Sequence, residues 1–190
     1  ELRAVTQSAT DGADIDFADG LNILAVPNTS GKSTCMMSML YALGLEGMLG
    51  PSQSPPLPDA LQRPVMIEGR EVTVLAGHVR LEIENQSGES FTATRKVTGT
   101  TKERQLIRGV MGADLTQPSP GYARKDFYVR TQGAAQSQAG FHRFLADFMD
   151  LELPRVPGIE TESVPLYLEC LFPFFFVDQL TGWRDVKSRL

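Results

Sequence analysis

The sequence contains few of the residues on which disulfide-rich and zinc-binding proteins depend. Its 190 residues include two cysteines, Cys35 and Cys170, and two histidines, His78 and His142. Two cysteines outside any CxxC pair do not make a disulfide framework. We expect both to be small buried apolar residues in a reducing environment. Neither histidine has a cysteine or a second histidine near it, which argues against a zinc site.

Long hydrophobic runs and an excess of positive charge are also missing. The longest apolar run, LFPFFFV at residues 171–177, is far shorter than the roughly 18 residues that a membrane-spanning helix needs. The N-terminus lacks the basic-then-apolar pattern of a signal peptide. A net charge of −5 gives the whole chain no general attraction to nucleic acid. We therefore expect a cytoplasmic globular protein without a membrane partner.

Strand signals dominate the first 26 residues. Residues 2–7 and 13–17 are predicted to be short strands, with the pair Asp11-Gly12 as the turn between them. After a second turn, residues 21–26 (LNILAV) form a nearly continuous apolar run. Such a run is typical of a strand that is buried on both faces.

A helix is predicted at residues 32–43. It carries apolar side chains at the spacing of one helical face: Cys35, Met36, Met39, Leu40 and Leu43. Gly44 stands where a C-terminal cap is expected.

Residues 65–130 are predicted to form antiparallel β-structure. Several short segments alternate apolar with polar residues, and NQSGES at residues 85–90 is a good hairpin turn. Residues 50–64 contain five prolines and are predicted to be a loop. Residues 126–130 (DFYVR) are predicted to be a strand. Residues 141–151 and the segment SVPLYLECL have helical character.

The segment NTSGKST, between the apolar run and the helix, predicts a phosphate-binding loop. Such a loop needs backbone N–H groups around the phosphates, a lysine that reaches the β- and γ-oxygens, and a hydroxyl that ligates Mg²⁺. Lys32 and Ser33 would supply the last two, at the positive end of the helix. The predicted nucleotide contacts are Asn28, Thr29, Ser30, Gly31, Lys32, Ser33 and Thr34.

The strict pattern G-x-x-x-x-G-K-[ST] is broken because Val26 occupies the position of the first glycine. A β-branched valine is stiffer than glycine and avoids positive φ. We expect the backbone at Val26 to keep an ordinary β conformation, since the residues that touch phosphate come later in the loop.

The segment DFADGLNILAVPNTSGKSTCMMSMLYALGLEG resembles the N-terminal ATPase lobe of SMC-like ABC ATPases, which include RecF-like and RecN-like proteins. In that family F-x-x-G-L-N leads into G-P-N-G-S-G-K-S, and the next helix ends in A-L-G. The matching residues are Phe17, Gly20, Leu21, Asn22, Pro27, Asn28, Ser30, Gly31, Lys32, Ser33, Ala42, Leu43 and Gly44. Val26 and Thr29 depart from the pattern.

This resemblance implies an α/β fold, a P-loop NTPase of ABC-ATPase type with an antiparallel β subdomain, and ATP and Mg²⁺ as cofactors. One head lobe would span residues 1–190. Residues 1–50 would hold the strand pair, P-loop and first helix, and residues 65–130 the β subdomain. Residues 141–190 would hold a helical part, a Q-loop and the start of a coiled coil.

Asp178 and Gln179, in FFFVDQ, have two interpretations. In a Walker B strand the aspartate would be followed by a catalytic glutamate, but this chain has Gln179 there. In a Q-loop, Gln179 would reach Mg²⁺ and the attacking water. The order of segments favours the Q-loop, because in the resembled family it follows the antiparallel region and precedes a helical extension.

The sequence contains no LSGG-like signature and no Walker B strand with its glutamate. The resemblance implies that both lie in a C-terminal lobe beyond a coiled coil, so we expect little or no hydrolysis by this piece alone. It also implies as partners that C-terminal lobe, a second head in a homodimer, DNA and accessory subunits. The implied process is DNA repair, chromosome organisation or anti-phage defence.

Other functions remain open. The departures at Val26 and Thr29 would also suit a nucleotide-gated scaffold or structural subunit that does not hydrolyse ATP. A small P-loop kinase or GTPase would need an arginine-rich lid or a base-reading motif, and neither is found. The densest basic region is either a DNA contact or, as we favour, a solvated sheet face. It comprises Arg95, Lys96, Lys102, Arg104 and Arg108.

Overall fold

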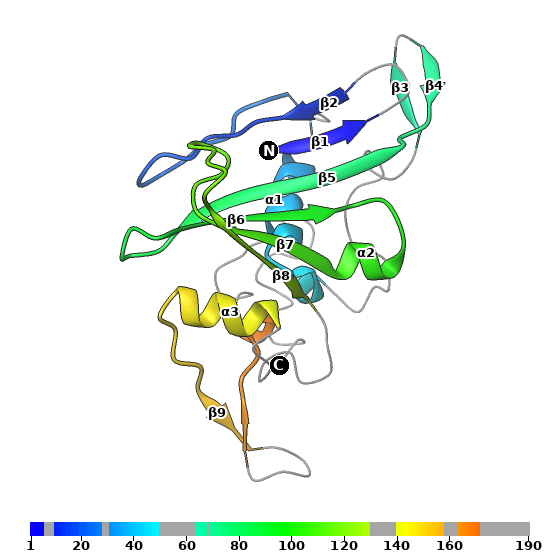
Figure 1. The fold of residues 1–190 in the computed structure, drawn as a ribbon. Helices are drawn as coiled ribbons and strands as arrows, with labels where there is room; N and C mark the ends of the chain where they lie inside the picture. The colour runs from blue at the N-terminus through cyan, green and yellow to red at the C-terminus, as the bar shows by residue number, and fades with distance from the viewer. Residues whose placement is uncertain are drawn as a thin grey trace.

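The computed structural model describes residues 1–5, 10–27, 31–49, 64–67, 69–129, 140–157 and 163–171. At its centre is a six-stranded sheet with the strand order β2-β1-β5-β6-β7-β8, in which every neighbouring pair is antiparallel (Figure 1). The strands are β1 (Leu2–Val5), β2 (Thr10–Ala13), β5 (Ala76–Glu84), β6 (Ser90–Lys96), β7 (Leu106–Met111) and β8 (Ala123–Tyr128).

Helix α1 (Lys32–Ala42) lies across one face of this sheet, which we call the inner face; Figure 1 views the opposite, outer face. The 3₁₀ turn η1 (Glu46–Leu49) follows α1. The other elements are β3 (Val65–Ile67), β4 (Arg70–Val72), α2 (Thr101–Gln105), α3 (Phe141–Phe148), β9 (Arg155–Val156), β10 (Val164–Pro165) and α4 (Leu168–Leu171). Strands β3 and β4 form one small antiparallel ribbon, and β9 and β10 form another.

Predictions that rest on local signals are confirmed. The helix predicted at residues 32–43 is α1. Gly44 ends it with φ of 68°, and its N–H donates to the carbonyl oxygen of Tyr41 at 3.0 Å. The hairpin turn at residues 85–90 joins β5 to β6, with Gly88 at φ of 77°. The predicted antiparallel region contributes β5 to β8.

One predicted strand is displaced, together with the turn before it. The pair Asp11-Gly12, predicted as a turn, lies inside β2, where Gly12 pairs with Arg3 of β1. The connection therefore falls at residues 6–9, outside the described residues, and the strand predicted at residues 13–17 begins and ends earlier. Cross-strand register decides this, because β1 is held on its other edge by β5 and fixes where β2 can pair.

The segment SVPLYLECL yields a shorter helix than predicted. Val164 and Pro165 pair with β9, so the helix is confined to α4. A proline lacks the N–H that a helix interior needs. The short helix α2, which connects β6 to β7, was not predicted.

Five phenylalanines join α3 to the inner face of the sheet. Their neighbouring ring centroids lie 4.5 to 6.1 Å apart, and the residues are Phe91, Phe127, Phe141, Phe144 and Phe148. Such tilted and edge-on contacts add to the burial of apolar area. Gly109 of β7 makes room for this cluster, since a Cβ there would lie 2.6 Å from the Phe91 ring.

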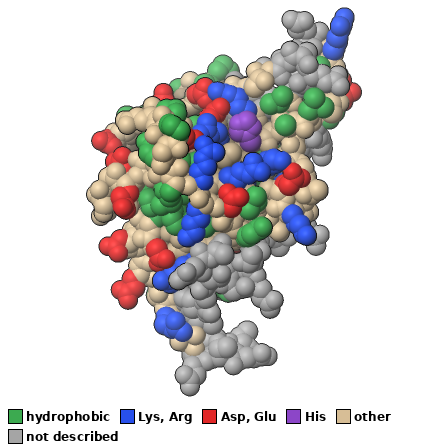
Figure 2. Space-filling view, in the orientation of Figure 1, with side chains coloured by type: hydrophobic (Ala, Val, Ile, Leu, Met, Phe, Trp, Pro, Cys, Tyr) green, Lys and Arg blue, Asp and Glu red, His purple; other side chains and the backbone are tan. Residues whose placement is uncertain are grey.

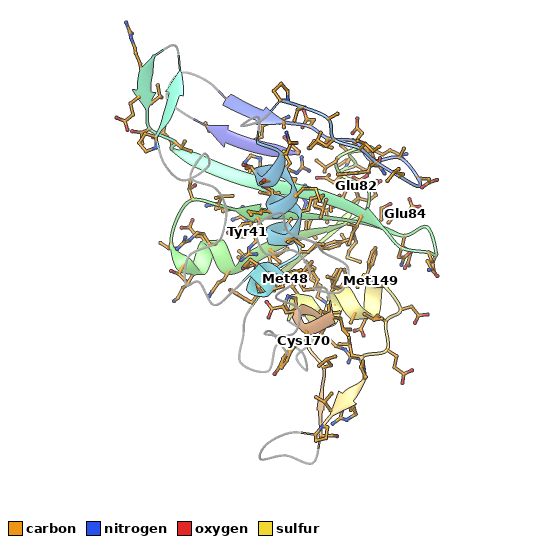
Figure 3. The ribbon with its side chains drawn as sticks, turned by 180° about the vertical axis from the view of Figure 1, so that it is seen from behind. Tyr41, Met48, Glu82, Glu84, Met149 and Cys170 are labelled. Atoms are coloured by element: carbon orange, nitrogen blue, oxygen red, sulfur yellow. The ribbon has the colours of Figure 1, made fainter. Side chains whose placement is uncertain are left out.

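The end of α1 joins both halves of the core. Tyr41 and Ala42 pack with Val79 and Val97 of the sheet. Leu40 packs instead with the phenylalanine cluster, η1 and α4. Figure 3, which shows the molecule from behind, places Tyr41 and Met48 between the helix and the sheet. The C-terminal half of α1 is therefore anchored on two sides.

The outer face is organised by Glu82 of β5. Its carboxylate accepts hydrogen bonds from the backbone N–H of Leu115 at 2.8 Å and from the hydroxyl and N–H of Thr116. Burial alone would raise the pKa of Glu82, but these hydrogen bonds outweigh it and hold that pKa below its usual value. The carboxylate thereby fixes the loop after β7 against β5.

Replacing Glu82 with glutamine should lower the free energy of unfolding by about 1 kcal/mol at pH 7, because the amide NH₂ would face donors. A lowered pKa contributes stability above the unfolded-state pKa and loses it as the pH falls through the folded-state value. The deficit of Glu82→Gln should therefore shrink below about pH 4.5. Urea unfolding at pH 7 and at about pH 3 measures this.

Glu84→Gln is the matched control, since Glu84 is an exposed residue on the same face of β5 (Figure 3). It should leave stability unchanged at both pH values. A deficit for Glu82→Gln that is equal at pH 7 and pH 3 would contradict the assigned role.

Candidate functional site

The N-terminus of α1 is built for an anion. Gly31 precedes the helix in the left-handed conformation, with φ of 83° and ψ of 14°, and its carbonyl accepts the first helical hydrogen bond from Cys35 at 2.9 Å. A residue with a Cβ would be strained there. No described side chain caps the first turn, and no acidic residue lies in it. Among the described residues, the N–H groups of the first turn therefore have no side-chain acceptor for their partial positive charge.

Helix α2 shows the opposite arrangement. Thr100 accepts from the backbone N–H of Glu103, and the Glu103 carboxylate accepts from the N–H of Thr100, which is a complete capping box. The ion pair from Lys96, followed by the bonds from Thr100, lowers the pKa of Glu103 to about 2. One helix of this fold supplies its own acceptor, and α1 does not.

The Lys32 side chain turns back over the loop that precedes α1. Its Nζ donates to the carbonyl oxygen of Val26 at 2.7 Å and to that of Pro27 at 3.0 Å. The ammonium group therefore bridges the start of the loop to the start of the helix. It lies on the exposed side of the chain, where phosphate oxygens could replace the two carbonyls as acceptors.

Val26 fits the loop without strain. Asp150 is the only residue other than glycine with positive φ in the described part of the chain, so Val26 keeps an ordinary backbone conformation. The backbone at Val26 thus avoids positive φ, as expected for a β-branched residue.

The remaining predicted contacts differ in accessibility. Ser33 is exposed at the start of α1, which suits a hydroxyl that would ligate Mg²⁺. Thr34 is 9% exposed, so its side chain packs inward and only its backbone can face a ligand. Asn28, Thr29 and Ser30, like Asp178 and Gln179, lie outside the described residues.

The segment predicted as a buried strand at residues 21–26 is neither a strand nor buried. Leu21 is 86% exposed and Ile23 79% exposed. The Asn22 side chain closes the preceding turn by bonding to the backbone of Ala18 and Gly20. A strand that is buried on both faces needs neighbours along its edges, and no described strand pairs with these residues. We call residues 14–26 the arm.

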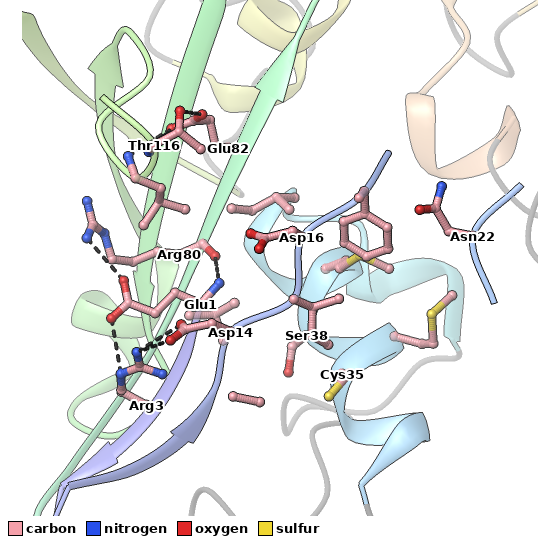
Figure 4. A pocket seen from close by; sticks show the side chains of 18 of the residues that line it. Glu1, Arg3, Asp14, Asp16, Asn22, Cys35, Ser38, Arg80, Glu82 and Thr116 are labelled. Carbon is pink, nitrogen blue, oxygen red and sulfur yellow. Dashed lines mark hydrogen bonds and ion pairs between the residues drawn. The ribbon is translucent and has the colours of Figure 1, made fainter. Parts of the chain in front are cut away.

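A cavity of about 920 Å³ separates the arm from α1 and β5 (Figure 4). Its wall toward α1 and the arm is largely apolar, with Ile15, Phe17, Ile23, Leu24, Met36 and Met39. Its two arginines are paired with acidic side chains: Arg3 with Asp14, and Arg80 with Asp114 at 2.6 Å. Asp16 and Glu82 also line the cavity and form no ion pair with a described residue, so acidic side chains outnumber arginines in the wall.

The exposed side of α1 faces this cavity. The helical face predicted from the sequence included Cys35, Met36 and Met39, but Met36 is 42% exposed, and Cys35 and Met39 are half-buried. The fully buried side carries Ser38 and Tyr41 instead, because the sheet covers that side only. Cys170 was also expected to be buried and is exposed.

The basic region divides between the two faces of the sheet. Alternation along β6 places Arg95 on the inner face with Phe91, and Arg95 is 2% exposed, so it cannot contact DNA. Lys96, on the outer face, is paired with Glu103 at 2.7 Å. Arg108 and Arg124 are exposed there and form no ion pair with a described residue. Figure 2 shows several Lys and Arg side chains on this face.

Sequence reasoning missed the most buried charge. Arg95 forms an ion pair with Glu46 of η1 at 2.6 Å, across 49 positions of sequence. One signal could have found its position: the alternation Phe91, Ala93, Arg95 puts the arginine on the apolar face of β6. Nothing in the local sequence identifies Glu46 as its partner.

Within the described residues no helix is long and apolar enough to cross a bilayer. A family profile for an AAA domain matches residues 6–126, which is more than half of the chain and includes the predicted P-loop, α1 and the strands from β2 to the middle of β8. No curated protein and no solved structure gives a significant match. The uncapped helix with Lys32 at its start thus lies inside a recognised nucleotide-binding domain, and the chain belongs to the AAA domain family of P-loop ATPases.

Proposed function

We propose that this chain is the ATP-binding N-terminal lobe of an SMC-like ABC ATPase head that engages a second head on binding ATP. The observation that carries the proposal is the start of α1. There the left-handed Gly31 and the side chain of Lys32 precede a helix start that no described side chain caps, with the spacing of a P-loop. Membership of the AAA domain family supports nucleotide binding at that place.

The phosphates would lie on the N–H groups of the loop and first turn, with Lys32 transferring its hydrogen bonds from Val26 and Pro27 to the β- and γ-oxygens. Exposed Ser33 suits Mg²⁺, as does the lack of a competing acidic side chain in the first turn. Bound between Ser33, Gln179 and phosphate oxygens, Mg²⁺ would offset the charge that develops during phosphoryl transfer.

Chain geometry supports the assignment of Gln179. Helix α4 ends at Leu171 beside η1, so the chain leaves the described part near the C-terminal end of α1 (Figure 3). Helix α1 is about 16 Å long. The eight residues from 172 to 179 can span up to about 26 Å. Gln179 is therefore within reach of Ser33 at the other end of α1.

The exposure of the arm supports the proposal that a second lobe packs against it. Residues 21–26 expose large apolar side chains and lie in no described strand, as expected of a segment whose neighbours lie in another part of the head. In the proposed head, the C-terminal lobe covers this segment and supplies the catalytic glutamate. The signature motif comes from the second head.

Replacing Lys32 with alanine should weaken binding of ATP with Mg²⁺ by about 10- to 100-fold, since charge-assisted hydrogen bonds contribute about 1.5–3 kcal/mol each. Isothermal titration calorimetry measures this. Lys102→Ala is the matched control, because Lys102 is also an exposed lysine in the first turn of a helix, but of the capped helix α2. Equal ATP affinity in Lys32→Ala and the unsubstituted protein would disprove the site.

Turnover by the chain joined to its C-terminal lobe separates this proposal from the scaffold alternative, which the departures at Val26 and Thr29 favour. Gln179→Ala should lower the rate of hydrolysis by at least about tenfold while ATP still binds, because Gln179 would position the metal and water. ATP binding without any turnover in the unsubstituted protein would favour a nucleotide-gated scaffold.

A DNA contact, the alternative to the solvated face that we favour for the basic region, would lie on the outer face of the sheet. Arg108 and Arg124 are exposed there on neighbouring strands; Asp126 lies opposite Arg108 in the register, and neither arginine forms an ion pair with a described residue. Replacing both with alanine should weaken DNA binding and reduce the salt slope of log K by about 2, since each phosphate contact contributes roughly 0.9. Lys125→Ala, on the other face of β8, is the control. An unchanged salt slope in the double variant would show that DNA does not bind this face.

A further inference from the structure

All three nitrogen atoms of the Arg95 guanidinium donate hydrogen bonds. Its Nε donates to the carbonyl oxygen of Arg104 at 2.6 Å. Its Nη1 and Nη2 donate to the two carboxylate oxygens of Glu46 at 2.8 and 2.6 Å, and Nη1 also donates to the carbonyl oxygen of Tyr41. The group lies 3.8 Å above the centre of the Tyr41 ring. These contacts fix both its position and its plane.

Two of these acceptors are helix ends. Tyr41 lies in the last turn of α1, where its carbonyl also accepts from the N–H of Gly44, and Arg104 lies in the last turn of α2. Positive charge is favoured at such ends. The Tyr41 hydroxyl adds a third link by donating to the carbonyl oxygen of Lys96 on β6 at 2.6 Å. Burial raises the pKa of Tyr41, so this hydroxyl remains a donor.

A buried ion pair of this kind has little freedom to rearrange. Arg95 is 2% exposed and the Glu46 side chain 14% exposed, so neither charge can move into water without breaking the pair. Loss of one partner would leave the other charge buried and unpaired. The C-terminal end of α1 therefore has one defined position against β6 and α2.

The N-terminal end of α1 has no ion pair among the described residues. Its buried side chains, Thr34 and Ser38, are small, and the Ser38 hydroxyl donates to the carbonyl oxygen of Thr34 within the helix. The Lys32 side chain contacts loop carbonyls only, and Ser33 and Met36 are exposed. The pairing at the other end is therefore the strongest constraint on the direction of the first turn. A tilt of about 5° at Tyr41 displaces the start of this helix, about 13 Å away, by about 1.2 Å.

We propose that Arg95 is a positioning residue for the nucleotide site: by clamping the C-terminal end of α1 to β6, η1 and α2, it aims the first-turn N–H groups and Lys32 at the phosphates. This inference rests on the proposed function, since it concerns the same site. Arg95 itself does not touch the nucleotide. A misplacement of about 1 Å at a reacting group costs on the order of 100-fold in rate.

Two variants of the full chain test the clamp. Arg95→Lys keeps the charge but cannot form the bidentate pair with Glu46. The double variant Arg95→Met with Glu46→Leu removes both charges and leaves neither buried alone. Lys96→Met is the control, because it breaks the neighbouring ion pair with Glu103 on the outer face of the same strand.

Hydrogen exchange of the α1 amides without nucleotide is the first readout, and the affinity for ATP with Mg²⁺ by calorimetry is the second. Thermal unfolding checks that each protein is folded. Both Arg95 variants should speed exchange in residues 32–42 and weaken ATP binding at least about tenfold, whereas Lys96→Met should change neither. Folded Arg95 variants with unchanged exchange, or with faster exchange but unchanged ATP affinity, would overturn the inference.

Failure of the proposed function gives a different result. If the unsubstituted protein binds no ATP, the proposed nucleotide site is disproved, and Arg95 cannot position it. The exchange readout would then still report whether Arg95 holds α1. If the unsubstituted protein binds ATP and the two Arg95 variants bind it equally well, only the inference about Arg95 fails.

Discussion

The structure depends on the packing of one side of α1 against the inner face of an antiparallel sheet. Tyr41 and Leu40 of α1 enter the two parts of the core, and the arginine at Arg95 joins the end of the helix to β6. The sheet covers only that side. The other side of α1 borders the cavity and the arm, so one constraint explains the fixed end of the helix, its open N-terminus and the exposed apolar segment at residues 21–26.

Local chemistry made part of this fold predictable. The left-handed glycine at Gly44, the hairpin turn at residues 85–90 and the alternation of the β segments are signals that need no distant partner. The strand predicted at residues 21–26 failed because burial on both faces requires neighbouring strands, which the described residues do not provide. The turn predicted at Asp11-Gly12 failed for a related reason, because the register imposed by β1 overrode a local preference.

The residue types of the candidate site were predictable from the sequence, but the long-range contacts that hold its helix in place were not. The spacing of Gly31, Lys32 and Ser33, directly before a predicted helix, indicates a phosphate loop. The ion pair between Arg95 and Glu46 joins residues 49 positions apart, and the buried side of α1 is shifted from the one that its apolar residues predicted. Long-range pairing of this kind leaves no local pattern, although the alternation of β6 does place Arg95 on the apolar face.

The N-termini of α1 and α2 are satisfied in different ways. Helix α2 satisfies its first turn with Thr100 and Glu103, and that carboxylate is held ionised by its neighbours. Helices α1 and α3 have no side-chain acceptor at the first turn among the described residues, but only α1 has a left-handed glycine before it and a lysine, Lys32, at its start. Unsatisfied donors cost free energy unless something binds them. Their retention at α1, on a helix anchored firmly at its other end, is explained if an anion completes the first turn during function.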